Sequence, residues 1–126
     1  MKTPKAIGLV TAFGCLALFV ILAPLAAAQG KQDFTLYNRT GQAITEMYVS
    51  PASQDEWGED ILGIDVLANG ESTTIHFSPK ERAAKWDIKL VDEDGKPHMR
   101  YAFNLLDIDE ITVRSNGDGS WYWNWK

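Results

Sequence analysis

Three tryptophans at the end of the chain have the spacing of a binding platform. Trp121, Trp123 and Trp125 alternate with other residues, so in a β-strand their rings lie on one face. If exposed, the rings could stack on a glycan or dock into an apolar groove of a partner protein. A small domain has few large apolar residues to spare, and the same rings could instead close one edge of its core. The sequence leaves both interpretations open.

Another tryptophan stands in a loop of mixed composition that could also bind a ligand. The segment 50–60 follows an expected strand, and Trp57 lies there close to Asp55 and Glu56. The ring could stack on a sugar or a cationic group while the carboxylates supply hydrogen bonds or charge. The alternative is that Trp57 folds back over the core and the acids are solvated, since tryptophan usually buries most of its surface.

Acidic residues gather in three stretches of the chain and are candidates for calcium binding. Calcium takes about six to eight oxygen ligands, several of them carboxylates. Loops at one end of a β-sandwich could supply these oxygens if the stretches meet in space. The segment 92–95 also has the simpler explanation of a hairpin turn, because Asp94 followed by Gly95 suits a tight turn. The calcium candidates are Asp60, Asp92, Asp94, Asp107 and Asp109.

No residue pattern in the sequence indicates catalysis. His76 and His98 are the only histidines, and neither has a serine or an acid at a telling spacing. Paired carboxylates for glycoside hydrolysis are present by number alone, which leaves a small hydrolase using acidic residues as an alternative. We therefore expect no enzymatic activity and no cofactor, and we expect both histidines to be solvated or half-buried on strands.

The first 28 residues have the composition of a secretory signal peptide. Lys2 and Lys5 precede an apolar run over 6–25, and alanines follow at 26–28. The pattern predicts cleavage after Ala28, which places the protein in the periplasm or outside the cell and leaves one domain over residues 29–126. The alternative is an uncleaved anchor, since about 20 apolar residues could span a bilayer. Membrane contact would then come through the leader alone.

Charge and cysteine content exclude several kinds of function. Cys15 lies in the leader, so residues 29–126 contain no cysteine and can form neither a disulfide nor a thiolate metal site. Removing the leader takes away two of the 12 Lys and Arg residues and none of the 17 acids, so the formal net charge falls from −5 to −7. An acidic chain without a basic cluster is a poor nucleic-acid binder, because phosphate neutralisation supplies most of that affinity.

Alternation of apolar and polar residues dominates the chain after the leader and predicts a fold made almost entirely of β-strands. Turn signals separate the strands at intervals of about ten residues, which predicts a small antiparallel β-sandwich of seven or eight short strands. A short strand over 61–66 and a single helical turn over 78–84 are also expected. The main expected strands are 34–38, 44–50, 72–77, 85–92, 96–103, 110–115 and 120–125.

The string FTLYNRTGQAITEMYVSP, followed by DEWGEDILG and WDIKLVDEDG, resembles a family of small secreted proteins of Gram-negative bacteria. The resemblance covers the segment from Phe34 to Val113 and implies a single β-domain of unassigned function behind a leader peptide. Family members often carry one cysteine just before the strand that contains Trp86 here and another near Leu105 or Leu106. This chain has neither, so apolar packing would take the place of a disulfide.

Some relatives in this family carry the label argininosuccinate lyase. The Gly-Ser-Ser-x-Met-Pro signature of that enzyme is absent from this chain, so the resemblance implies no lyase activity. The sequence as a whole predicts a secreted, non-catalytic binding module for an envelope protein or a glycan. Its expected surface combines the 50–60 loop with the terminal tryptophans, and a calcium-stabilised structural module is the alternative.

Overall fold

The computed structural model describes residues 31–126, and the predicted leader lies outside the described residues. The described chain forms seven strands joined by turns and loops, and none of its helices is long and apolar enough to cross a membrane. The strands are β1 (Phe34–Arg39), β2 (Ile44–Pro51), β3 (Ser72–Ile75), β4 (Lys85–Asp92), β5 (Pro97–Asn104), β6 (Glu110–Ser115) and β7 (Trp121–Trp125).

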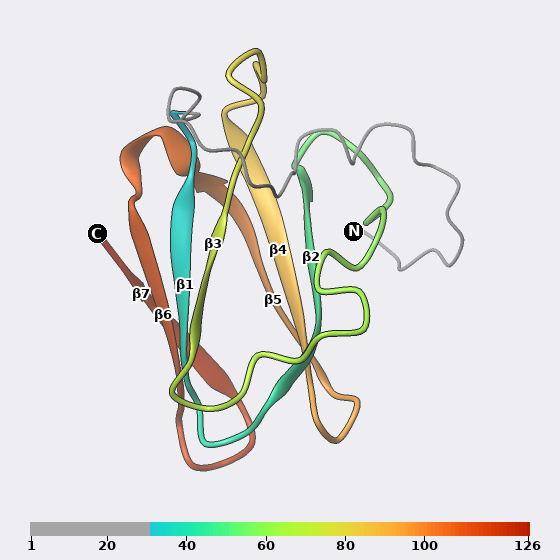
Figure 1. Cartoon of the computed structure of the whole chain (residues 1–126), viewed down its shortest axis with the longest axis vertical. Coiled ribbons are helices and arrows are strands. Elements are labelled where there is room, and N and C mark those ends of the chain that lie inside the picture. The colour runs from blue at the N-terminus through green and yellow to red at the C-terminus, as the bar shows by residue number, and fades with distance from the viewer. Residues whose placement is uncertain (1–30) are drawn as a thin grey trace.

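The strands pack as two facing sheets, which confirms the expected small β-sandwich (Figure 1). One sheet has four strands in the order β3-β1-β6-β7, and the other has three in the order β2-β4-β5. The neighbours are antiparallel with one exception, the pair β1 and β6, which run parallel. This parallel pair was not expected from the sequence, because alternation predicts the faces of a strand and not its partner.

The core lies between the inner faces of the two sheets. Each strand sends alternate side chains inward, as a two-residue period requires. β4 is buried along almost its whole length, with Trp86, Ile88 and Leu90 facing the core. The described core is continuous from one end of the sandwich to the other; its fully buried large side chains include Phe34, Leu36, Ile44, Met47, Leu105, Ile111 and Val113.

Two local expectations from the sequence differ from the structure. The segment 61–66 is a run of turns and coil instead of a strand. The expected helical turn over 78–84 is reduced to one hydrogen-bonded turn, in which the Glu81 amide donates to the Ser78 carbonyl at 3.0 Å. The first error has a clear physical cause, since this part of the chain closes the free edge of β2. The Asp60 carboxylate accepts hydrogen bonds from the Met47 and Leu62 amides at 2.9 and 3.0 Å, and the Ile61 amide donates to the Met47 carbonyl at 2.8 Å. A short 3-10 helix at Leu105–Asp107, which the sequence did not predict, follows β5.

A β-bulge in β5 holds the one non-glycine residue with a positive φ among residues 31–126. Trp86 pairs with Phe103 and Ile88 with Arg100, so two residues of β5 lie opposite Asp87. Ala102 is one of these two, with a φ of 60°. Its amide donates to the Asp87 carboxylate at 2.9 Å, which fixes the bulge.

Replacing Ala102 by glycine is expected to stabilise the protein by about 1 kcal/mol, because the left-handed conformation costs an L-residue about 1–2 kcal/mol and part of the gain is lost to the greater freedom of glycine in the unfolded chain. Ala102→Val should destabilise it, since a branched Cβ fits this conformation poorly. Urea unfolding of both variants checks the prediction. Opposite shifts of the midpoint support it, and a less stable glycine variant contradicts it.

Candidate functional site

The structure buries Trp57, although outside the core cluster over which the sequence suggested it could fold. Trp57 is only 1% exposed and lies on the outer face of the three-stranded sheet, with Tyr101 at 6.2 Å between ring centroids. The Lys89 ammonium lies 5.4 Å from the Trp57 ring and 4.5 Å from the Tyr48 ring. Asp55 and Glu56 are exposed beside it. Trp57 therefore acts as a cover for Lys89 and is not presented to a ligand.

The side chains under this cover have shifted pKa values because they are removed from water. Burial lowers the pKa of the Lys89 ammonium, and the nearby Glu46 charge opposes part of that shift. Burial also raises the pKa of the Tyr48 phenol, whose hydroxyl donates to Glu46 at 2.6 Å. For Asp60, burial raises the pKa of the carboxyl and outweighs the hydrogen bonds from Met47 and Leu62. Asp60 thus anchors the end of the loop to β2 through the Met47 amide.

Two of the three terminal tryptophans belong to the core. Trp121 and Trp123 are 9% and 8% exposed, because β7 lies over β5 and turns these rings inward. Trp121 stacks on His98 with centroids 3.7 Å apart, and Trp123 packs against Phe103 at 5.8 Å. The expected exposed platform of these two rings is therefore not present.

Trp125 is 44% exposed, but its ring is already in contact with other side chains. The Arg100 guanidinium lies 4.6 Å from its centroid, and Phe103 contacts it edge-on at 5.2 Å. This cation–π contact occupies a face on which a sugar could stack. The terminal tryptophan thus closes the side of the sandwich where β5 and β7 lie near each other.

The acidic stretches do not converge into a calcium site. Nowhere in residues 31–126 do three or more Asp, Glu, His or Cys side chains gather closely enough to hold a metal ion. The Asp60 carboxylate accepts a hydrogen bond from the Met47 amide of β2, and the Asp92 carboxylate lies 2.9 Å from His98 Nε2. The Asp107 carboxylate accepts a hydrogen bond from the side-chain amide of Asn104 at 3.1 Å. Asp94 and Asp109 are exposed to solvent. Asp60, the Asp92 and Asp94 pair and the Asp107 and Asp109 pair belong to three separate connections between strands.

Both histidines pair with an aspartate. His98 and Asp92 are 5% and 3% exposed at the side chain, and the ring of Trp121 covers His98. His76 Nδ1 lies 3.1 Å from Asp33, whose other oxygen accepts from the Phe77 amide at 2.7 Å. The first pair is sealed in the interior, although the sequence suggested a solvated or half-buried His98; the second ties the start of the described chain to the end of β3.

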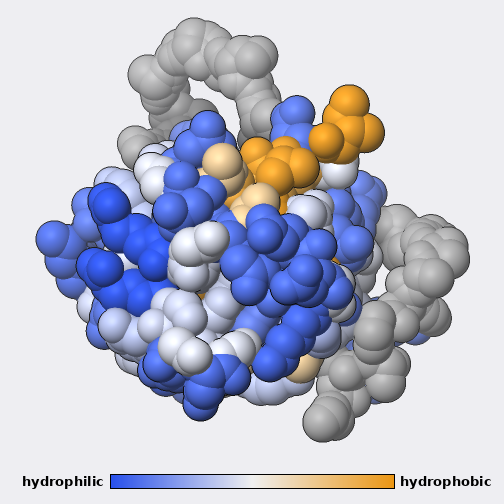
Figure 2. All heavy atoms as spheres, turned by 90° about the horizontal axis from the view of Figure 1, so that it is seen from below, coloured by the Kyte–Doolittle hydropathy of each residue, from blue (hydrophilic) through white to orange (hydrophobic). Residues whose placement is uncertain are grey.

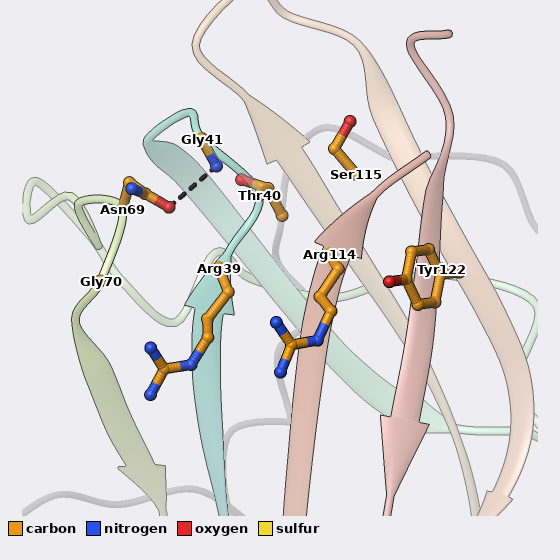
Figure 3. A pocket seen from close by; sticks show the side chains of 8 residues that line it. All are labelled: Arg39, Thr40, Gly41, Asn69, Gly70, Arg114, Ser115 and Tyr122. Carbon is orange, nitrogen blue, oxygen red and sulfur yellow. Dashed lines mark hydrogen bonds between the residues drawn. The ribbon is translucent and has the colours of Figure 1, made fainter. Parts of the chain in front are cut away.

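The outer face of the four-stranded sheet carries an arginine pair that the sequence analysis did not identify. Arg39 at the end of β1 pairs in register with Arg114 of β6, so both side chains rise from neighbouring strands on one face. Figure 3 shows the two guanidinium groups side by side, with the Tyr122 hydroxyl of β7 turned toward Arg114. No salt bridge from either arginine to an acid is found within residues 31–126.

The arginines line a pocket of about 470 Å³ that is open to solvent. Its floor and one wall come from Arg114 and Ser115 of β6 and from Tyr122 of β7, and the other wall comes from the two turns that flank β1 and β3. No acid and no histidine lines it. Arg39 lies at the end of β1, and the residues from the two turns are Thr40, Gly41, Asn69 and Gly70.

Asn38 fixes the wall of this pocket from inside. Its side chain is fully buried and donates to the carbonyls of Gln42 and Leu67 at 2.8 and 2.9 Å. Its carboxamide oxygen accepts from the Thr40 amide and hydroxyl. The Gly41 amide in turn donates to the Asn69 side chain at 2.8 Å, the bond drawn in Figure 3. Gly41 has a φ of 91°, which this turn requires and which a residue with a Cβ rarely adopts.

The arginine pair is an electrostatic exception in this acidic protein. Like charges on neighbouring strands repel each other, and the register places these two arginines side by side. Glu71, the acid nearest in the chain to the pocket turn, directs its carboxylate to the Ala68 amide at 2.9 Å. An anion between the two guanidinium groups would remove their repulsion and accept charge-assisted hydrogen bonds from both.

The surface around this end of the sandwich has two contrasting sides. Seen from below, the most hydrophilic surface lies on the side of β1, β6 and β7, and an apolar patch stands out on the other side (Figure 2). Exposed apolar side chains in the turn segment between β2 and β3 are Ile64, at 97% exposed, and Val66, at 51%. The arginine pocket therefore belongs to a polar face.

Comparison with known proteins supports the fold and is silent about the site. No family model matches this sequence, and no curated protein is significantly similar to it. A solved structure, the NMR structure of a protein from Eubacterium rectale, is similar with a TM-score of 0.53 and 12% sequence identity. The similarity covers 78% of this chain and 87% of that chain. At this identity the likeness extends to the β-sandwich fold alone.

Proposed function

We propose that this chain is a secreted, non-catalytic binding module whose ligand carries an anionic group. The observation that carries the proposal is the register of Arg39 and Arg114, which places two positive charges side by side at a pocket without an acidic partner. Arginine is suited to this role because its planar fork of donors matches carboxylate and phosphate oxygens. The predicted leader supports a location in the periplasm or outside the cell.

The residues of the pocket favour binding over catalysis. Hydrolysis with acidic residues needs two carboxylates flanking a substrate, and the pocket is lined by none. His98 is enclosed between Asp92 and Trp121 and cannot reach a substrate without disrupting the core. The polar groups that remain at the pocket are donors and hydroxyls, which can orient a ligand but supply no general base.

Inorganic phosphate is expected to bind the pocket with a dissociation constant of about 1 mM, or −4 kcal/mol, and Arg39→Ala or Arg114→Ala is expected to weaken it at least about tenfold. Binding should also weaken as salt is added, because exposed charges are screened. Amide shifts of Gly41, Gly70 and Ser115 during an NMR titration measure the affinity and report the site.

Arg82→Ala is the matched control for this experiment. Arg82 is exposed on the connection between β3 and β4, at the opposite end of the sandwich from the turn that follows β1 (Figure 1). The control removes one arginine and the same formal charge without touching the pocket. An equal loss of phosphate affinity in all three variants would show that the effect comes from net charge alone, and it would contradict the proposed site.

A further inference from the structure

We propose that the ligand is an acidic sugar chain that places its one acidic group between Arg39 and Arg114 and continues over the outer face of β1, β6 and β7. The inference rests on the proposed function and deepens it by naming the class of ligand. Three observations carry it: the register of the polar rows on this face, the chemistry of their side chains, and the distribution of charge along the face.

The first observation is that polar residues line up across three strands. Arg39, Arg114 and Tyr122 form one row, because Arg39 pairs with Arg114 and Arg114 pairs with Tyr122. The next row along the strands on the same face is Tyr37, Thr112 and Asn124, joined by the same register. Two residues along a strand cover about 6.8 Å, so the second row begins directly beside the pocket.

The second observation is the chemistry of this face. Its two rows offer hydroxyl groups, an amide and two phenol rings, and Tyr122 is 41% exposed. The outer positions of β1, β3, β6 and β7 include no Leu, Ile, Val, Met or Phe. The centre of a protein–protein interface is normally apolar, so this face suits a polar ligand better than a protein partner. Sugars offer hydroxyls for such groups and apolar ring faces that can pack on tyrosine.

The third observation is that positive charge without an acidic partner lies at one end of the face among the described residues. Beyond the second row lies a third row formed by Thr74, Thr35 and Glu110. The two threonine hydroxyls bond to each other at 2.9 Å, and Glu110 pairs with Lys126 at 3.6 Å. The Arg39 guanidinium carbon lies 5.9 Å from the Tyr37 ring centroid, so the first row also touches the second. One acidic group at the pocket, followed by uncharged sugars, therefore matches the face better than a polyanion.

The test is a binding panel of matched oligosaccharides on the full chain, measured by calorimetry beside inorganic phosphate. The panel pairs xylotriose with aldotetraouronic acid, in which one glucuronate is added, and lactose with sialyllactose. At least one acidic member is expected to bind about tenfold tighter than both its neutral partner and phosphate. Arg114→Ala should remove this binding, and Arg82→Ala should leave it unchanged.

A second variant separates the sugar contacts from the anion contacts. Thr112→Val keeps the size and the strand preference of the side chain but removes its hydroxyl, so it should fold normally. It is expected to weaken the acidic sugar several-fold and to leave phosphate binding unchanged. An equal effect on both ligands would overturn the contact of the sugar with the second row.

The outcomes distinguish this inference from the proposed function. If phosphate binds through Arg39 and Arg114 but no acidic sugar binds tighter, the function stands and the sugar assignment is wrong. If neutral sugars bind as tightly as their acidic partners, the sugar assignment is wrong, and the arginine variants with phosphate alone decide the proposed function. If neither phosphate nor any acidic sugar binds, both fail.

Discussion

Trp86→Ala is expected to lower the free energy of unfolding by about 3–5 kcal/mol, the usual loss for a fully buried large aromatic side chain. Trp86 is 1% exposed and contacts Phe77 edge-on, with centroids 4.9 Å apart. Its indole N–H donates to the Gln32 side chain at 2.6 Å and to the Ala83 carbonyl at 3.0 Å. Both acceptors lose this donor in the variant, which adds to the cost of the cavity. Urea unfolding monitored by circular dichroism measures the change.

This loss is a large fraction of the total free energy of unfolding of a small domain, which is about 5–15 kcal/mol. Trp125→Ala is the matched control, since it removes the same side chain from a position that is 44% exposed. The control should cost clearly less than Trp86→Ala, because nearly half of the Trp125 side chain is already exposed in the folded protein and truncation leaves no enclosed cavity. Similar losses in the two variants would contradict the assignment of Trp86 to the centre of the core.

Asp92→Ala is expected to destabilise the protein by about 3–5 kcal/mol, because it leaves His98 buried without its partner. The carboxylate lies 2.9 Å from His98 Nε2 and accepts hydrogen bonds from the Asp94 and Lys96 amides at 2.9 and 3.0 Å. Asp92→Asn should cost clearly less, since its carbonyl oxygen can still accept from both amides of the hairpin turn. Unfolding of the two variants at pH 7, compared with the parent, gives the measurement.

The same carboxylate makes stability depend on pH in a defined direction. Burial on its own raises the pKa of Asp92, but the hydrogen bonds from His98, Lys96 and Asp94 outweigh it and hold the pKa below its ordinary value. The unfolded chain therefore binds this proton more readily than the folded one. The contribution of Asp92 is complete above about pH 4, the ordinary pKa of aspartate, and is lost as the pH falls through the lower folded value. Asp92→Asn should reduce the loss of stability at acidic pH. If the variant loses as much stability as the parent when the pH falls, other groups cause that loss.

The sequence predicts most of the strands because each one has a buried face. Leu36, Met47 and Leu90 each stand in a clear two-residue alternation, and all three lie in strands at the expected places. The 61–66 segment misleads for the same reason. Its apolar residues have the composition of a strand, but Ile61 and Leu62 pack against the core from a turn that closes the edge of β2.

The candidate site could not be predicted from the sequence, because it depends on pairing between distant strands. Arg39 stands just beyond the expected strand 34–38, and Arg114 stands in the separate expected strand 110–115 with no signal to connect the two. Only the register of β1 against β6 brings them together. The tryptophans were candidate ligand contacts because their rings are large and aromatic. In a small domain such rings are usually buried in the core, as Trp121 and Trp123 are here.

The position of β1 in its sheet also bears on how the chain acquires its structure. β1 is the first strand, and one of its two neighbours is β6, the last strand but one. Contacts between residues so far apart close late and slow the folding of β proteins. Nearly the whole chain must therefore be synthesised before the four-stranded sheet can assemble, whereas the β2, β4 and β5 sheet needs no residue beyond β5. The two halves of the sandwich thus become available for folding at different times.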